Sequence, residues 1–487
     1  MTAPTITACD VDLRADPARM IARFFVPGRE SVGAGSSRAG PVVERVMALD
    51  EDQLERLAAS FLERLAPRHR DPEALLRRHA ALVRSRIDSS DELSVARELV
   101  LGACFTHEFA IEGAALCNPS MVPHPVQPGD GTVRFIVSVR GIGEGHCSSI
   151  GFRTGTVGCD GTVTIEAPGP YAAVGEAGAG VHHRSVFQLE LAEVGDRENV
   201  AYVLDGLPER FGSDELDLRL ASLADDSATR TATALSTDHL RELAQRSYCV
   251  RFDHGSALDE RVLWPHASFE HQGMEDARFV RFVDDDGNVV YLATYTAFDG
   301  RAIAQQLLET LDFETFESSA IVGAAAANKG LALFPRRIGG RYAALSRSDR
   351  ETNAIAFSDD LRCWPTSEVF QAPQDAWELL QLGNCGAPIE TPEGWLVLTH
   401  AVGPLRTYTI GAVLLDLDDP SRVLARSVEP LIEPGSEGRD GYVPNVVYSC
   451  GSMAYGDLLV IPYGIADQRI AVATLSITAL LRSMRAV

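Results

Sequence analysis

The sequence predicts an all-β fold, a five-bladed β-propeller, preceded by an N-terminal α-helical accessory domain. Two observations support this prediction. After Gly102 the chain becomes a series of short apolar or alternating runs bounded by Gly, Asp and Pro, which is typical of β-strands. Within that region one unit recurs, a glycine turn followed by an apolar strand that ends in polar residues. Its copies open at Gly131, Gly287, Gly340, Gly394 and Gly456.

The spacing of these copies predicts that residues 104–487 form the propeller. The last four copies begin 53, 54 and 62 residues apart, close to the period of roughly 40–50 residues that propeller blades show. The first gap is much longer, so we expect a large insertion at about residues 165–260.

Residues 1–103 have a different texture and predict the accessory domain. Apolar residues recur three to five positions apart from Val46 to Leu65, as on one face of a helix, and further apolar residues continue the pattern to Val83. Before them, Gly33–Gly40 has the Gly and Ser content of a flexible connector. We expect the helices to serve packing or subunit contact.

Composition limits the partners of this chain. Its 487 residues carry a net charge of −24, which disfavours nucleic acids and anionic membranes because phosphate contacts need clustered Lys and Arg. Nine cysteines show no zinc-like spacing, which indicates reduced thiols. The N-terminus lacks a signal-peptide pattern, and no apolar run approaches the ~20 residues of a membrane span. We therefore expect a cytoplasmic protein, for which a homo-oligomer is possible.

Polar residues recur in phase with the repeated unit. A short turn about nine to fourteen residues before each strand holds a small polar or charged side chain, and each strand ends in another. Because the inner strands of a propeller line one channel, we expect these side chains to meet at one mouth, although Asn and Asp are also ordinary turn residues. The turn residues are Asn118, Asp276, Asn328 with Lys329, Asn384 and Asn445, and the strand-end residues are Arg140, Thr296, Arg347, His400 and Asp467.

Asp276 is the candidate catalytic acid. It follows Glu275, and two carboxylates in near contact raise the pKa of one of them, as a proton donor at neutral pH requires. An acidic turn paired with Arg278 is the alternative interpretation.

Lys329, Arg347 and His400 are candidate anion ligands, whereas Arg336, Arg337 and Arg341 fit solvated surface charges. Aromatic residues that are candidates for stacking on a sugar ring, or for the core, are Phe298, Tyr295, Tyr408, Tyr463 and Trp377.

From Phe105 to the C-terminus, these motifs resemble a known family of enzymes. The stretches that carry the likeness include THEFAIEGAALCNPSMVPHP, GMEDARFVRF, TYTAFDG, NKGLALFPRRIGGRYAALSR, GAPIETPEGWLVLTHAVGP, YTIGAVLLDLDDPSRVLARS, GYVPNVVYSCG and YGIADQ. Together they resemble glycoside hydrolase family 130, the inverting mannoside phosphorylases and related β-mannosidases with a five-bladed propeller. The helical N-terminus is similar to that of long-chain members.

The resemblance implies a role for each matched position. Asp276 corresponds to the family's catalytic acid, which protonates the glycosidic oxygen through the 3-hydroxyl of the mannosyl unit. Asn118, Arg140 and Asp467 correspond to positions that hold the mannose. Asn328, Arg347 and His400 correspond to the side where inorganic phosphate attacks the anomeric carbon. To these we add Lys329 at the phosphate, and Asp299 and Tyr463 at the sugar. The expected substrates are a β-mannoside oligosaccharide and phosphate, with no metal or organic cofactor.

Two departures from the family pattern leave the reaction open. Ala327 and Gln381 stand where the phosphorylases of the family usually carry Arg and Lys. Phosphorolysis giving mannose 1-phosphate is the first hypothesis. Hydrolysis on the same scaffold is the second, with Glu390 or Glu378 as the base that activates water. A non-catalytic glycan-binding propeller is the third.

Overall fold

The computed structural model describes residues 4–27, 38–87, 92–191, 197–226 and 230–487. Most of the predicted connector Gly33–Gly40 lies outside the described residues. The chain divides into two compact units. The larger comprises Met1–Ala15, Ala114–Pro168 and Val174–Val487, and the smaller comprises Asp16–Gly113 and Gly169–Ala173.

The smaller unit is mainly helical, with one two-stranded sheet. Its elements are β2 (Met20–Phe24), α1 (Ala39–Met47), α2 (Glu51–Leu65), α3 (Pro72–Val83), a short 3₁₀ turn (Arg84–Arg86), α4 (Val95–Cys104) and β3 (Thr106–Ala110), which pairs with β2. Asp50 caps α2 by accepting a hydrogen bond from the Gln53 backbone N–H, a standard helix start. Leu54, Leu76 and Leu101 form the core between these helices, and the first two belong to the predicted apolar pattern.

The larger unit is mostly β, in agreement with the predicted class. Within the described residues most of its strands fall into five consecutive antiparallel groups, two of which belong to one twelve-stranded sheet. The groups are β4 (Ala115–Pro123), β5 (Val133–Ile142), β6 (Ser148–Val157) and β7 (Val163–Ile165); β14 (Gly273–Val283), β15 (Val289–Phe298), β16 (Ile303–Thr310) and β17 (Thr315–Ala320); β18 (Ala332–Leu333), β19 (Tyr342–Ser346), β20 (Asn353–Ser358) and β21 (Glu368–Gln371); β22 (Gln381–Asn384), β23 (Ile389–Thr391), β24 (Gly394–Gly403), β25 (Thr407–Leu415), β26 (Val423–Arg426) and β31 (Arg485–Ala486); and β27 (Val447–Tyr448), β28 (Met453–Tyr455), β29 (Leu458–Ile465), β30 (Arg469–Ser476) and β1 (Thr7–Arg14).

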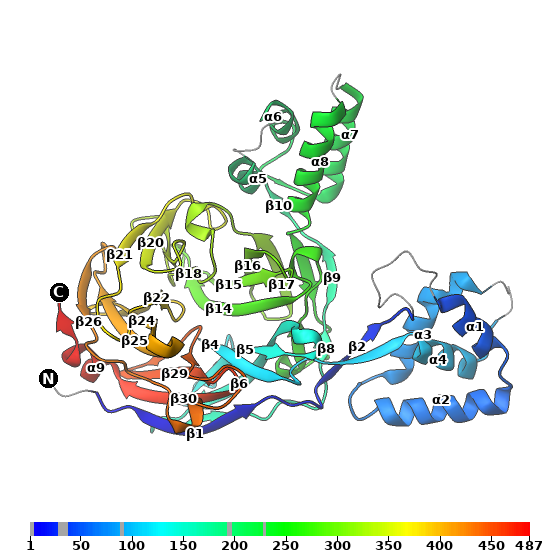
Figure 1. Cartoon of the computed structure of the whole chain (residues 1–487), viewed down its shortest axis with the longest axis horizontal. Coiled ribbons are helices and arrows are strands. Elements are labelled where there is room, and N and C mark those ends of the chain that lie inside the picture. The colour runs from blue at the N-terminus through cyan, green and yellow to red at the C-terminus, as the bar shows by residue number, and fades with distance from the viewer. Residues whose placement is uncertain (1–3, 28–37, 88–91, 192–196, 227–229) are drawn as a thin grey trace. The chain divides into compact units, whose positions relative to one another are not determined.

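Strands from all five groups lie around a common centre (Figure 1). The first two groups merge into one twelve-stranded sheet through a single parallel pairing of Gly273 with Ser148. That sheet also contains β8 (Ala173–Val174), β9 (Glu176–Ala179), β12 (Tyr248–Arg251) and β13 (Arg261–Leu263), and α9 (Ile477–Ser483) follows β30.

Strand β1 belongs to the larger unit, although it precedes the accessory helices in the chain. It pairs antiparallel with β30, so residues that were predicted to precede the accessory helices complete the sheet of the C-terminal strands. Val11 of β1 is buried beside Ile470 and Val472, which explains why this strand is held there. The smaller unit then runs to Gly113 instead of ending at residue 103, because β3 follows α4 and pairs with β2.

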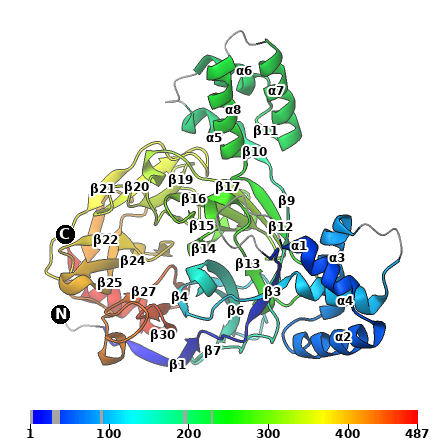
Figure 2. The same ribbon diagram turned by 45° about the vertical axis from the view of Figure 1, so that its right-hand side comes forward.

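A helical insertion occupies part of the predicted gap at residues 165–260. It contains β10 (His182–His183), α5 (Arg184–Glu190), α6 (Arg197–Asp205), β11 (Arg210–Phe211), α7 (Ser213–Asp226) and α8 (Arg230–Ala244). Figure 2 shows that these helices lie together as one group. Val203, Leu220 and Leu240 form their shared core, which also packs against Ala320 and Val322 at the end of β17.

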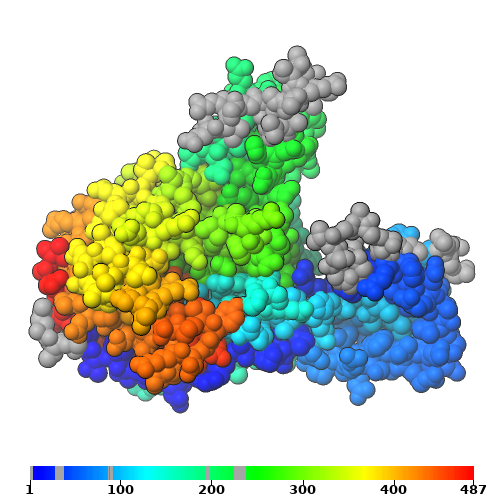
Figure 3. Space-filling view, viewed as in Figure 1, coloured from blue at the N-terminus to red at the C-terminus, as the bar shows by residue number. Residues whose placement is uncertain are grey.

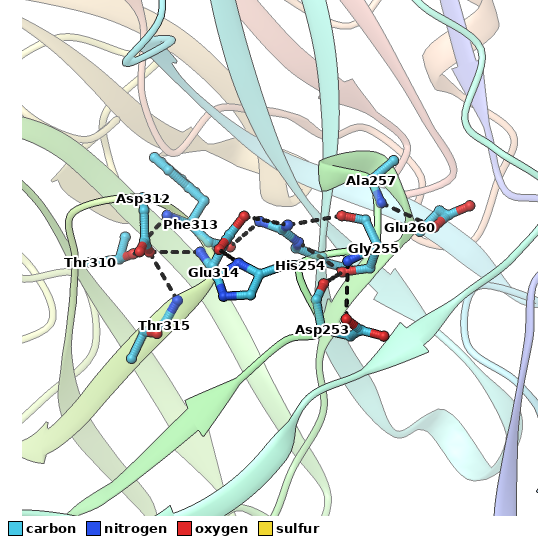
Figure 4. A network of polar contacts seen from close by, with 12 residues as sticks. Asp253, His254, Gly255, Ala257, Glu260, Thr310, Asp312, Phe313, Glu314 and Thr315 are labelled. Carbon is cyan, nitrogen blue, oxygen red and sulfur yellow. Dashed lines mark hydrogen bonds and ion pairs between the residues drawn. The ribbon is translucent and has the colours of Figure 1, made fainter.

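A polar network fixes the chain between β12 and β13 to the β16–β17 turn. Figure 4 shows Asp253–Glu260 opposite Thr310–Thr315. The buried guanidinium of Arg261 donates to the carbonyl oxygen of Phe313 at 2.9 Å and to the Glu314 carboxylate at 3.2 Å. His254 contacts the same carboxylate at 2.5 Å. These contacts therefore fix the β16–β17 turn of the second group to the chain that leads into β13.

The burial of β1 leads to a stability prediction. Val11→Asp places a carboxylate in the apolar cluster between β1 and β30, so we expect it to lower the free energy of unfolding by about 3 kcal/mol or more. Asp10→Asn, on the exposed neighbouring position, should change it by less than about 0.5 kcal/mol. Urea unfolding measures both. Equal effects of the two changes would mean that β1 does not contribute to this core.

Candidate active site

Two β-bulges aim short polar side chains toward the centre of the strand groups. The β4–β5 register shifts between Cys117 and Ser120, and the β14–β15 register shifts between Glu275 and Arg278. At each bulge one residue has a left-handed backbone, Asn118 with φ 50° and Asp276 with φ 57°. Asn and Asp tolerate this conformation better than other non-glycine residues. The residue type at both positions therefore suits the backbone as well as the chemistry.

A cavity of about 130 Å³ lies where these bulges meet. It brings together seven of the predicted site residues, which come from all five strand groups or the turns beside them. The full lining is Asn118, Arg140, Asp276, Lys329, Arg347, Gln381, His400, Arg406, Tyr408, Val443, Val446, Tyr448 and Asp467.

Arg140 and Asn118 hold the Asp276 carboxylate. Arg140 Nη1 donates to Asp276 Oδ1 at 3.1 Å, and Nη2 donates to Glu275 Oε1 at 2.5 Å. Asn118 Nδ2 donates to the same Oδ1 at 2.5 Å. The Oδ2 atom of Asp276 takes part in neither of these contacts. Asp276 is thus fixed by one of its two oxygens.

The pKa of Asp276 is lowered, contrary to the predicted proton donor with a raised pKa. Burial alone would raise it, but the charges of Arg140, Lys329 and Arg278 and the hydrogen bond from Asn118 lower it well below its ordinary value. The sequence argument considered only the neighbouring Glu275. Burial, more than the neighbouring Asp276 charge, raises the pKa of Glu275 instead, against the opposing effect of Arg140.

Lys329 and Arg347 form a cationic wall of the cavity. No carboxylate of the described residues lies within 4.0 Å of either charged group, and Arg347 Nε is buried without a hydrogen-bond partner. Buried charge without a partner is unfavourable, so these groups suit an anion that binds there. An oxyanion would occupy this side of the cavity.

His400 positions the Arg347 side chain and adds no charge to the cationic wall. Burial, then the Arg347 and Arg278 charges, lower the pKa of His400 well below its ordinary value. The ring is therefore neutral. His400 Nδ1 lies 3.0 Å from the carbonyl oxygen of Asn384, which requires the proton on Nδ1. Nε2 then accepts from Arg347 Nη1 at 3.1 Å. The predicted phosphate ligand His400 thus has both ring nitrogens engaged and positions Arg347.

Three predicted ligands do not line the cavity. Asn328 is buried, and its side chain donates to the Arg347 carbonyl oxygen at 3.1 Å, so it holds the backbone of Arg347 in place. Asp299 accepts from the backbone N–H groups of Arg301 and Ala302, the usual use of Asp in a turn. Tyr463 packs against apolar residues of β29 and β30. Asp299 therefore has a local turn role and Tyr463 a packing role in this structure, outside the cavity.

The predicted bases for hydrolysis also lie elsewhere. Glu390 is bound by Arg336 at 2.9 and 2.7 Å in an exposed ion pair. Glu378 is buried and accepts from the backbone N–H groups of Gln374 and Asp375. Within the described residues, the carboxylates that line the cavity belong to Asp276 and Asp467.

Sequence reasoning missed part of the lining. Arg406 and Tyr448 were not proposed as site residues, and Tyr408 was weighed only as an aromatic residue near the mouth. The Tyr408 and Tyr448 rings lie 6.2 and 4.7 Å from the His400 ring, and the Tyr448 hydroxyl accepts from Arg278 at 2.8 Å. Tyr448 lies at the end of the motif GYVPNVVYSCG, which could have identified it.

The other polar turn residues serve as supports. Thr296 accepts from Gln305 at 3.0 Å, the Asn384 side chain donates to the Gly330 carbonyl oxygen at 2.7 Å, and the Asn445 carbonyl oxygen accepts from the Tyr408 N–H. Among the described residues, no group of three or more His, Cys, Asp or Glu is placed to hold a metal ion. No described helix has the length and apolar character of a membrane span.

Comparisons with known proteins show the family to which the chain belongs. A family profile described as β-1,4-mannooligosaccharide phosphorylase matches residues 248–486. A 1,2-β-oligomannan phosphorylase from Thermoanaerobacter sp. (strain X514) is 38% identical over 230 residues, which are 45% of this chain and 73% of that protein. The chain belongs to glycoside hydrolase family 130. The resemblance predicted from the motifs is thereby confirmed.

Two further similarities are to β-1,2-mannobiose phosphorylase from Listeria innocua. A β-1,2-mannobiose phosphorylase from Listeria innocua is 33% identical over 239 residues, 47% of this chain and 66% of that protein. A solved structure of β-1,2-mannobiose phosphorylase from Listeria innocua in complex with β-1,2-mannobiose covers 77% of this chain and 93% of its own, with 22% identity and a TM-score of 0.46. The family profile begins after the strands that carry Asn118 and Arg140.

Asp467 leads to a pH-dependent prediction. Burial raises its pKa to about 6 from 3.8, although Arg140 opposes the shift. A carboxyl whose pKa is raised on folding favours the folded state at low pH, and that contribution is lost as the pH rises through about 6. Asp467→Asn, which mimics the neutral carboxyl, should therefore stabilise the protein by about 2–3 kcal/mol at pH 8 and by little at pH 4. Thermal unfolding at both pH values checks this, and a constant difference would contradict it.

Proposed function

We propose that this family 130 enzyme is an inverting β-mannoside phosphorylase that uses inorganic phosphate and releases mannose 1-phosphate. One observation carries the proposal. The Asp276 carboxylate shares a single cavity with Lys329 and Arg347, two cations that have no carboxylate of the described residues within 4.0 Å. The relatives named above act on β-1,2-linked mannosides, so a β-1,2-mannobiose is the first substrate to test.

We also propose that the five strand groups form the five blades of a β-propeller. Each group is antiparallel, the groups follow one another in chain order, and β1 adds to the last of them. Closing the last group with an N-terminal strand protects its edge, as closed β architectures require. The cavity would then lie at one mouth of the central channel.

In the proposed reaction, the mannosyl unit lies between Asp276 and the cationic wall. Asn118, Arg140 and Asp467 bind its hydroxyl groups, as the family resemblance implies. A phosphate oxygen forms the new bond to the anomeric carbon while the glycosidic bond breaks on the opposite face. The leaving oxygen takes a proton that originates from Asp276 and passes through the 3-hydroxyl. Lys329 and Arg347 stabilise the phosphate through charge-assisted hydrogen bonds.

Phosphate binding would also favour the protonated form of Asp276. Burial raises the pKa of Asp276, but without phosphate the charges of Arg140, Lys329 and Arg278 outweigh burial and keep this pKa low. A phosphate dianion beside Lys329 offsets this positive charge, so the pKa of Asp276 rises when phosphate binds. The acid would therefore be protonated when the nucleophile is in place.

The same geometry argues against hydrolysis. An inverting hydrolase needs a second carboxylate on the face opposite the acid to activate water. Glu378 and Glu390 are engaged outside the cavity, and the Asp467 side chain lies near Arg140 and Asp276, on the sugar side. A cationic wall serves phosphate, whereas it would not activate water as a base.

The decisive experiment separates three functions. Incubation with β-1,2-mannobiose should release mannose 1-phosphate only when phosphate is present, as followed by anion-exchange chromatography. Free mannose alone, formed without phosphate, would indicate hydrolysis, and binding without any product would indicate a glycan-binding protein.

Asp276→Asn should reduce kcat by about 10²- to 10⁴-fold, the usual contribution of a general acid. An unchanged kcat would remove Asp276 from that role.

The cationic wall predicts a separate effect on phosphate. Lys329→Gln should raise the KM for phosphate roughly 10- to 100-fold, because one charge-assisted contact is lost. The KM for the mannoside should change by less than about twofold. Arg341→Gln is the matched control, since this arginine is exposed and faces Asp359. A phosphate KM that stays at the control value would place the anion elsewhere.

A further inference from the structure

The turn Gly403–Thr407, here called the rim turn, carries Arg406 to the edge of the catalytic cavity. It joins β24 to β25 and contains one 3₁₀ turn. Leu405 and Arg406 both have left-handed backbones, with φ 60° and 57°. Two consecutive non-glycine residues in this region are strained, and such strain concentrates at functional sites.

A turn of matching backbone shape clarifies what is unusual here. Between β5 and β6, Gly145 and His146 have φ 64° and 60°. Glycine takes the first of these positions without strain. His146 then lies 2.7 Å from the Tyr442 hydroxyl, and Figure 3 shows the orange segment that contains residue 440 against the cyan segment that contains residue 140. That contact gives the matching turn a structural role.

The rim turn has no corresponding contact among the described residues. No carboxylate of the described chain lies within 4.0 Å of the Arg406 guanidinium, whose ring contact is with Tyr408 at 6.0 Å. Leu405 is 90% exposed beside it. A strained, exposed leucine and an unpaired arginine therefore meet solvent at the edge of the cavity.

The charge of Arg406 acts on the sugar side of the cavity. It lowers the pKa of Asp467, against the larger effect of burial and after that of Arg140. The main charges that act on His400 are instead those of Arg347 and Arg278. The Arg406 charge thus reaches Asp467, which lines the same cavity.

We propose that the rim turn binds the sugar that leaves on phosphorolysis and enters as acceptor in the reverse reaction. Arg406 donates N–H groups to the hydroxyls of this sugar, and Leu405 covers one of its C–H faces. This assignment rests on the proposed function, because it presupposes a mannosyl unit bound deeper in the cavity. The rim turn then sets the preference for the acceptor without contributing to the bond-breaking step.

The test uses the reverse reaction, in which mannose 1-phosphate and an acceptor mannose give mannobiose and phosphate. Arg406→Gln should raise the KM for the acceptor roughly 10- to 100-fold, as expected for loss of hydrogen bonds from a charged donor. The KM for mannose 1-phosphate, and that for phosphate in the forward direction, should stay within about twofold. Arg422→Gln is the control, because this arginine is exposed on another turn beside β25.

A second variant separates binding from folding. Leu405→Gly relieves the left-handed strain, so its melting temperature should equal or exceed that of the parent protein. Its acceptor KM should nevertheless rise several-fold if Leu405 covers the sugar. A raised phosphate KM for Arg406→Gln with an unchanged acceptor KM would assign Arg406 to the cationic wall. No change in either constant would overturn the proposal.

Calorimetric binding of β-1,2-mannobiose to the full chain carrying Asp276→Asn keeps this proposal distinct from the proposed function. If the parent protein forms no mannose 1-phosphate but Arg406→Gln still weakens mannobiose binding in that background, the rim turn binds sugar and phosphorolysis is wrong. If the parent is active and Arg406→Gln leaves both binding and acceptor KM unchanged, only the rim-turn assignment fails.

Discussion

The ion pair between Arg140 and Asp276 is the interaction on which the cavity of the candidate active site depends. It joins β5 of the first strand group to β14 of the second, at the point where these groups share one parallel pairing. Arg140 also binds Glu275, so one guanidinium balances two neighbouring carboxylates. Both side chains are largely buried, where Coulomb interactions are strong and an unpaired charge is costly. The cavity can therefore keep other cations free for an anion only because this pair is satisfied within it.

Around this pair, the backbone determines which side chains fit. Asn118, Asp276 and Asp467 all have left-handed φ values, a conformation in which short polar residues are tolerated. Their side chains project from bulges or tight turns that the neighbouring strands hold in register. Strain in these positions is small compared with the packing of the surrounding sheets, and it gives each polar group one direction. The same device recurs at Arg406, where the surrounding turn is exposed.

A second layer of contacts keeps the charge distribution of the cavity uneven. Asn384 fixes the tautomer of His400 through its carbonyl oxygen, and His400 then accepts from Arg347. Because His400 is neutral, Arg347 keeps its charge available without a nearby carboxylate. In a chain of net charge −24, a cationic wall of this kind is a local feature that bulk composition conceals.

The sequence by itself determined the β-rich class, the repeated strand unit and the position of the insertion, because strand patterns and glycine turns are local signals. It also identified Asp276, Arg140 and Arg347, since their motifs recur in phase with the strands. Only the tertiary structure decided that β1 joins β30, that Asp299 caps its own turn and that Tyr463 lies among apolar residues. It alone showed that Arg140, Lys329 and Arg278 lower the pKa of Asp276. These outcomes depend on distances between residues far apart in the chain, and such distances leave no trace in local sequence.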